Sequence, residues 1–178
     1  MTTVAFLVAA DGIEQVELTQ PWRDVQDAGA TPVLVADTTG TVQGRNGLEK
    51  ADTFEVDRQP NEIDLDGIDA LVLPGGVANP DALRTDEWAV KLVSNALEAG
   101  VPVAAICHAP WTLIETGHLS GRKVTSWPSL RTDLRNAGAE WVDEEVVVCT
   151  GGKGPLITSR NPDDLDAFGK AIVDHLPS

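Results

Sequence analysis

The chain has 178 residues, 42% of them hydrophobic, which is enough for one domain (1–178) with a substantial core. The 28 acidic and 13 basic residues give a formal net charge of −15, which argues against nucleic acid or a membrane as a partner, because both require basic patches.

No apolar run approaches the about 20 residues of a membrane-spanning helix, and no basic region precedes the first apolar run, so we interpret that run as a strand and not as a signal peptide. Two cysteines 42 positions apart do not make a disulfide framework, so we expect a cytoplasmic protein with reduced thiols. The acidic excess leaves two interpretations open, a halophilic host or an ordinary acidic protein.

Short apolar runs alternate with amphipathic segments along the chain. The pattern predicts helices over 13–28, 86–99, 110–116, 129–137 and 163–176, and a hairpin over 41–56. It predicts strands over 4–9, 32–36, 70–73, 101–106, 123–125, 140–142, 146–149 and 156–159. This alternation indicates an α/β fold with a mainly parallel sheet covered by helices on both faces.

Three segments follow strands whose carboxyl ends meet at one edge of such a sheet: 10–14, 74–77 and 107–109. Ligand sites in open parallel sheets form at that edge. No GxGxxG motif follows the first strand and no GxxxxGK[ST] motif occurs, so the sequence signals neither a dinucleotide site nor a nucleotide triphosphate site.

The stretch "AAICHAP" places Cys107 directly after an apolar strand and before a helix. A nucleophile elbow needs small residues two positions before and two after the nucleophile, and Ala105 and Ala109 meet this condition. A helix N-terminus favours the thiolate. We therefore predict that Cys107 is a nucleophile; the alternative is a small buried residue at the end of a strand.

The neighbours of Cys107 predict an oxyanion hole. Adjacent side chains on an elbow are expected to diverge, so His108 contributes its backbone N–H and not its imidazole. Gly75 and Gly76 are the natural second source of such N–H groups, because glycine lets a substrate approach the backbone closely. A plain turn explains the Pro74-Gly75-Gly76 tripeptide equally well.

Two carboxyl groups follow the first strand. Glu14 lies at the expected start of a helix on the same edge of the sheet, where it could share a proton with the Cys107 thiol. Glu17 lies one turn further along the same face. Each is also explained as a first-turn acid that the helix dipole favours.

The segments "DGIEQVELTQP", "DALVLPGG", "PVAAICHAPWTLIETG" and "KVTSWP" follow one another in an order that resembles the ThiJ/PfpI superfamily. That superfamily includes PfpI-type endopeptidases, general stress proteins, and glyoxalases also described as protein deglycases. The resemblance implies a flavodoxin-like three-layer sandwich, with Cys107 as nucleophile and Glu14 as its carboxyl partner. It also implies Gly76 and His108 as oxyanion-hole residues. In the PfpI branch an acidic residue after the "PGG" turn reaches the histidine of a neighbouring subunit, and Asp81 is the closest match, with longer spacing and a shorter side chain.

The chain departs from the family pattern at two positions. Ala109 replaces the usual glycine after the Cys-His pair, and Trp127 stands where some members have a tyrosine. Trp111 and Trp127 are expected to wall the substrate pocket together with Glu17 and Ala109, although both tryptophans could equally belong to the core. The segments "PWTLIETG" and "TSWPSL" place the chain nearer the general stress proteins than the archetypal peptidase.

The resemblance implies a stress-protective enzyme that acts on 2-oxoaldehydes or glycated adducts, as a homodimer or hexamer, with no metal or organic cofactor. A PfpI-type cysteine peptidase is a second reading, and a redox sensor in which Cys107 cycles through sulfenic acid is a third. A glutamine amidotransferase activity is set aside, because His175, the only late histidine, lacks the glutamate two residues on that would complete its triad.

Overall fold

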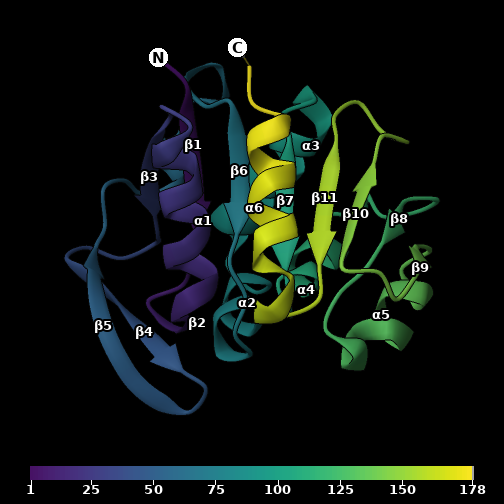
Figure 1. Cartoon of the computed structure of the whole chain (residues 1–178), viewed down its shortest axis with the longest axis horizontal. Coiled ribbons are helices and arrows are strands. Elements are labelled where there is room, and N and C mark those ends of the chain that lie inside the picture. The colour runs from purple at the N-terminus through teal and green to yellow at the C-terminus, as the bar shows by residue number, and fades with distance from the viewer. Residues whose placement is uncertain (178) are drawn as a thin grey trace.

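A six-stranded sheet forms the centre of the computed structural model, which describes residues 1–177 (Figure 1). The strands lie in the order β10-β11-β7-β6-β1-β3, and all neighbours are parallel except β10 and β11. Their bounds are β1 (Thr3–Leu7), β3 (Thr31–Val35), β6 (Ala70–Leu73), β7 (Val103–Ile106), β10 (Val146–Cys149) and β11 (Leu156–Ser159).

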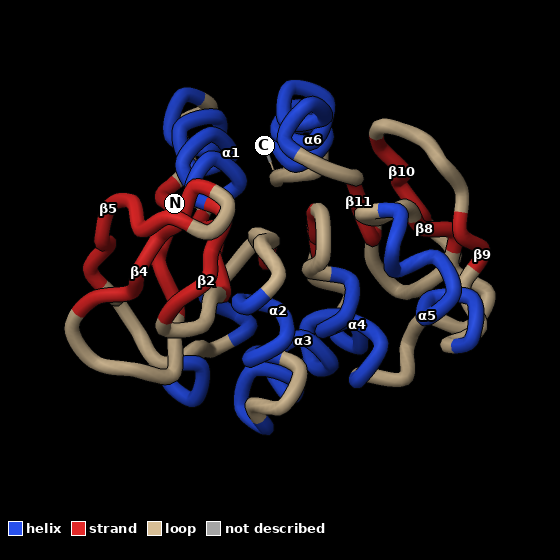
Figure 2. Tube along the Cα trace, turned by 90° about the horizontal axis from the view of Figure 1, so that it is seen from below, coloured by secondary structure: helices blue, strands red, loops and turns tan. Residues whose placement is uncertain are grey.

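Helices cover both faces of this sheet (Figure 2). The helices α1 (Gln15–Asp27) and α6 (Leu165–Asp174) lie on one face, and α2 (Ala78–Leu83), α3 (Glu87–Ala99) and α4 (Pro110–Glu115) lie on the other. At one end, α5 (Arg131–Asn136) packs beside the short strands β8 (Lys123–Val124) and β9 (Glu140–Trp141). The predicted three-layer α/β fold with a mainly parallel sheet is confirmed.

The alternation of side chains along β1 explains why both faces are covered. Val4 and Phe6 belong to the core cluster shared with α1 and α6, whereas Ala5 and Leu7 belong to the cluster on the α3 side. All four are fully buried, and the Phe6 ring lies 5.2 Å from that of Trp22 on α1. A strand with apolar side chains on both faces has to be covered on both faces, because its burial supplies the main favourable free energy of folding.

A second, three-stranded sheet lies beside the start of α1 (Figure 1). It consists of β2 (Asp11–Glu14) and the hairpin β4 (Thr41–Asn46) and β5 (Glu49–Glu55). The hairpin was predicted, but β2 and the short helix α2 were not. Because the backbone is still extended at Glu14, α1 begins at Gln15 and not at residue 13 as predicted.

Within residues 1–177, no helix combines the length and the apolar composition needed to cross a bilayer.

Candidate active site

Cys107 lies on a sharp turn between β7 and α4. Its φ of 64° makes it the one non-glycine residue with a positive φ among residues 1–177. The turn is fixed on both sides, because the Cys107 N–H donates to the Ser159 carbonyl at 3.1 Å and the Cys107 carbonyl accepts from the Trp127 N–H at 2.8 Å. A side chain held in this costly conformation at the end of a sheet has the geometry of a nucleophile elbow.

The carboxyl group beside the Cys107 thiol belongs to Glu17 and not to Glu14. Glu17 is fully buried and its carboxyl group lies beside Cys107, both next to Gly75; its Oε2 accepts from the Gly75 N–H at 2.9 Å, and its Oε1 has no hydrogen-bond partner among the described residues. Glu14 turns away: its Oε2 accepts from the Gly47 N–H at 3.1 Å, in the β4–β5 hairpin. The expectation for Glu14 was wrong because α1 begins at Gln15, two residues later than predicted. The later start directs Glu17, and not Glu14, toward the sulfur.

Burial controls the ionisation of this pair. The pKa of Glu17 is raised to about 8, because burial, together with the charge of Glu14, outweighs the opposing effects of Cys107 and of the Gly75 and Gly76 N–H groups. Burial and the charge of Glu17 also raise the pKa of the Cys107 thiol, although the N–H groups of Gly76 and His108 favour the thiolate. The helix N-terminus therefore does not lower the pKa of this thiol as expected. At neutral pH the Glu17 carboxyl group and the Cys107 thiol are therefore both mainly protonated, and the thiol can pass its proton to Glu17 only when that carboxyl group is ionised.

The His108 imidazole lies against the sulfur, contrary to the expected divergence. Its Nδ1 is 3.2 Å from the Cys107 Sγ. The ring stacks on Trp127 with centroids 5.5 Å apart and lies 5.3 Å from the Trp111 ring. Burial lowers the pKa of His108, so a neutral imidazole faces the thiol at neutral pH.

Two backbone N–H groups, those of Gly76 and His108, lie toward the sulfur. The Gly75 N–H does not share this role, because it donates to Glu17. Gly75 is required for space: a Cβ there would lie 2.3 Å from Glu17 Oε2 and 2.7 Å from Cys107 Cβ. Gly76 has a φ of 86°, which favours glycine.

Asn79 on α2 fixes the "PGG" turn, and the sequence analysis missed it. The side chain is fully buried. Its Oδ1 accepts from the Ala9 N–H at 2.7 Å, and its Nδ2 donates to the carbonyls of Pro74 and Gly75 at 2.9 and 3.0 Å. An asparagine before a proline is typical of a turn, so only the fold shows that Asn79 joins the loop after β1 to the turn after β6.

A cavity of about 1010 Å³ opens above Cys107. Its walls include Glu17, Trp111 and Trp127, which the sequence analysis placed in the substrate pocket, and also Asp81. Ala109 is not among the lining residues; it lies beneath the site, only 1% exposed, at the start of α4. The full lining is Asp11, Gly12, Glu14, Glu17, Arg45, Gly47, Leu48, Gly76, Val77, Ala78, Asp81, Cys107, His108, Trp111, Trp127 and Pro162.

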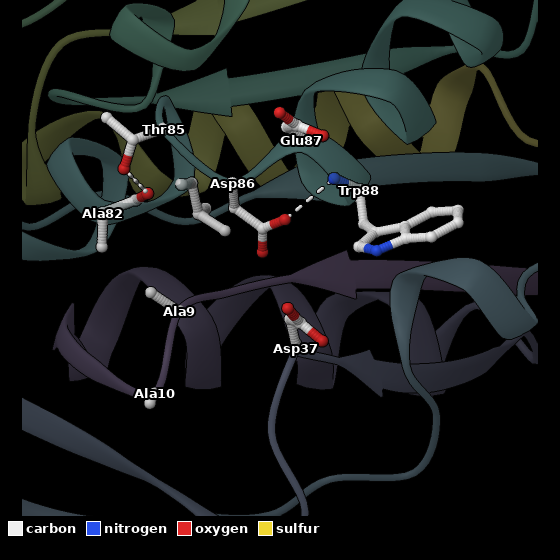
Figure 3. Close-up of a pocket in the computed structure, with 9 residues that line it drawn as sticks. Ala9, Ala10, Asp37, Ala82, Thr85, Asp86, Glu87 and Trp88 are labelled. Carbon is white, nitrogen blue, oxygen red and sulfur yellow. Dashed lines mark hydrogen bonds between the residues drawn. The ribbon is translucent and has the colours of Figure 1, made fainter.

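A second cavity, of about 450 Å³, lies at the start of α3 (Figure 3). Asp37 faces Asp86 and Glu87 across it, and the Asp86 carboxylate caps α3 by accepting from the Trp88 N–H at 2.9 Å. Its lining contains no cysteine or histidine. The nucleophile chemistry is therefore concentrated in the larger cavity. Across residues 1–177, no three histidine, cysteine, aspartate or glutamate side chains gather as a metal site would require.

The chain is similar to known proteins over nearly its whole length. The deglycase TK1284 of Thermococcus kodakarensis is 42% identical over 167 residues, which cover 94% of this chain and 95% of the relative. Protein/nucleic acid deglycase 2 of Escherichia coli is 40% identical over 171 residues, covering 96% and 95%. The crystal structure of Drosophila melanogaster DJ-1beta superposes with a TM-score of 0.86 at 27% identity, covering 98% of this chain and 90% of that chain. The DJ-1/PfpI family model matches residues 2–175, so the chain belongs to the DJ-1/PfpI family.

Proposed function

We propose that this protein is a cofactor-independent enzyme that converts 2-oxoaldehydes, free or as early glycation adducts, into hydroxy acids, with Cys107 as the nucleophile. The observation that carries the proposal is the position of the buried Glu17 carboxyl group beside Cys107 in the lining of a cavity of about 1010 Å³. The deglycase names of the two relatives support the same substrate class.

The reaction begins when the Cys107 sulfur adds to the aldehyde carbon of methylglyoxal, and the carbonyl oxygen takes up a proton to give a hemithioacetal. With a glycation adduct, the sulfur displaces the amine or thiol carrier from the same carbon and reaches the same intermediate. The ionised fraction of Glu17, whose carboxyl group lies beside Cys107, takes the proton from the sulfur. The N–H groups of Gly76 and His108 stabilise the developing oxyanion.

The hemithioacetal then rearranges internally. A proton leaves the former aldehyde carbon and another arrives at the neighbouring carbonyl carbon, so the first carbon is oxidised and the second reduced, with no external oxidant. Glu17 and the neutral imidazole of His108, 3.2 Å from the sulfur, are placed to carry these protons. Water hydrolyses the resulting lactyl thioester and restores the thiol.

We also propose a cytoplasmic homodimer or hexamer. The support is the rim of the cavity, where Leu48 is 94% and Val77 56% exposed beside Asp81. Apolar side chains gathered at a functional rim are typical of an interface. Light scattering that gave only the monomer mass, in dilute buffer and in molar salt, would contradict this assembly.

The test of function is lactate release from methylglyoxal without glutathione, with peptide hydrolysis and peroxide consumption followed in parallel. Wild type should release lactate with multiple turnovers, Cys107→Ser should release none, and Cys149→Ser should retain the activity. Peptide hydrolysis without lactate would favour the peptidase instead. Stoichiometric oxidation of Cys107 without turnover would favour the redox sensor.

A further inference from the structure

The cavity above Cys107 holds more negative charge than the proposed reaction uses. Three carboxylates, those of Asp11, Glu14 and Asp81, and one guanidinium, that of Arg45, line it in addition to the protonated Glu17. Arg45 is already neutralised, because Asp11 accepts from its Nε and Nη2 at 2.7 Å each, and its Nη1 donates to the Leu48 carbonyl at 3.0 Å. Glu14 and Asp81 have no counter-charge among the lining residues, which leaves a formal charge of −2.

The arginines next to the cavity are also paired. Arg84 lies over the Trp111 ring, 5.6 Å from its centroid, and its Nε donates to Glu115 at 2.8 Å. Arg160, two residues before Pro162, donates to both Asp164 and Asp143 at 2.9 Å. A phosphate entering this cavity would therefore meet no uncompensated guanidinium on these walls.

We propose that the site selects adducts whose carrier is cationic, such as a guanidinium or ammonium group of a peptide, and disfavours adducts carried by phosphate-bearing nucleotides. This selectivity rests on the proposed function and names its substrate class. A cleft lined by charges of one sign focuses the field and raises the local concentration of the opposite charge. Here the two uncompensated carboxylates line the same cavity as Cys107.

The first experiment measures the charge preference without turnover. Methanethiosulfonates that carry an ethyltrimethylammonium, a methyl or an ethylsulfonate group are reacted with the Cys149→Ser protein. In each reaction the Cys107 sulfur forms a disulfide and displaces methanesulfinate. The rates are normalised to those with 2-mercaptoethanol, which removes the intrinsic differences between the reagents. In dilute buffer the cationic reagent should react at least about 10-fold faster than the anionic one, and the ratio should fall toward one in 1 M KCl.

The second experiment measures the same preference in catalysis. Methylglyoxal hemithioacetals of thiocholine, 2-mercaptoethanol and 2-mercaptoethanesulfonate carry charges of +1, 0 and −1 on carriers of similar length. Lactate formation is measured after subtraction of the rate from free methylglyoxal. The expected order of kcat/KM is cationic, neutral, anionic. The methylglyoxal adduct of guanosine should likewise be preferred to that of guanosine monophosphate.

The variants Glu14→Gln and Asp81→Asn assign the effect to the cavity. Each should reduce the cation-to-anion ratio by about 3- to 10-fold in both experiments. Glu140→Gln is the matched control, because it removes the same charge from the exposed strand β9, outside the cavity, and should leave the ratio unchanged.

The outcomes separate this proposal from the proposed function. A cationic preference of Cys107 labelling that depends on Glu14 and Asp81 supports the selectivity even if no adduct yields lactate, a result that would contradict only the enzymatic proposal. Equal or reversed rates for the cationic and anionic reagents overturn the selectivity. So does an equal fall of the ratio in Glu140→Gln, because the preference would then come from the net charge of −15 and not from the cavity.

Discussion

Replacing Glu17 by glutamine should stabilise the protein, and the gain should grow with pH. The unfolded chain releases the Glu17 proton near the ordinary pKa of 4.5, whereas the folded chain holds it to about 8. Between these values the folded state binds more protons than the unfolded state, so stability falls as pH rises, by about 1.4 kcal/mol per pH unit. Glutamine does not ionise and can still accept the Gly75 hydrogen bond, so the variant escapes this loss.

The size of the effect follows from the two pKa values. The gain of Glu17→Gln over wild type is about 3 kcal/mol at pH 7, approaches zero below pH 4.5, and grows by about 2.5 kcal/mol between pH 5 and pH 7. Urea unfolding of both proteins at pH 5, 6 and 7 measures it, and any constant effect of the altered contact cancels in the pH dependence. A difference that stays flat over this range would show that Glu17 is ionised in the folded protein and would refute its raised pKa.

Three further predictions concern the site, the second thiol and the surface. Gly75→Ala should destabilise the fold by about 1–3 kcal/mol and lower kcat at least tenfold, because the new methyl group would overlap both Glu17 and Cys107. If the variant unfolds at the same urea concentration as wild type and has the same kcat, the packing described is contradicted. Cys149 should ionise at a lower pH than Cys107. Burial opposes the ionisation of Cys149, but its pKa is lowered by the N–H groups of Gly151 and Lys123 and by the buried Arg122. The Arg122 Nε donates to the Cys149 sulfur at 3.3 Å. Ultraviolet thiolate titration of Cys107→Ser and Cys149→Ser should show the lower pKa in Cys107→Ser, and the opposite order would disprove the assignment. The melting temperature should rise from dilute buffer to molar KCl as repulsion within the net charge of −15 is screened; a rise that continues beyond a few tenths molar would indicate a halophilic host, and a flat series would show that the acidic excess does not affect stability.

The layers of the fold could be predicted from the sequence because its strands and helices have distinct hydrophobic periods. The wholly apolar run at 70–73 can only be a strand buried on both faces, and it is β6. The short strand β2 was missed because Asp11 and Gly12 interrupt any alternation, and it forms through pairing with β4, a contact distant in sequence. Periodicity within one segment carries no information about such a partner.

At the candidate site the structure places Glu17 beside Cys107, one helical turn beyond the Glu14 that the sequence analysis chose. The elbow at Cys107 follows from the small residues around it, which are a local signal. The choice between Glu14 and Glu17 depends on where α1 begins, and β2 sets that boundary. The position of the His108 imidazole depends on Trp127, which lies 19 residues further along the chain (127 − 108) and stacks on the ring. Side-chain packing of this kind is decided by tertiary structure.

The central claim is that Glu17 is the residue that exchanges a proton with Cys107. Its most direct test compares kcat for glutathione-independent lactate formation in Glu17→Gln and Glu14→Gln, two identical chemical changes one helical turn apart. General acid–base catalysis contributes about 10²- to 10⁴-fold, so Glu17→Gln should lose at least about 100-fold in kcat, and the loss should exceed that of Glu14→Gln by at least about 30-fold. Equal losses, or a larger loss in Glu14→Gln, would contradict the account.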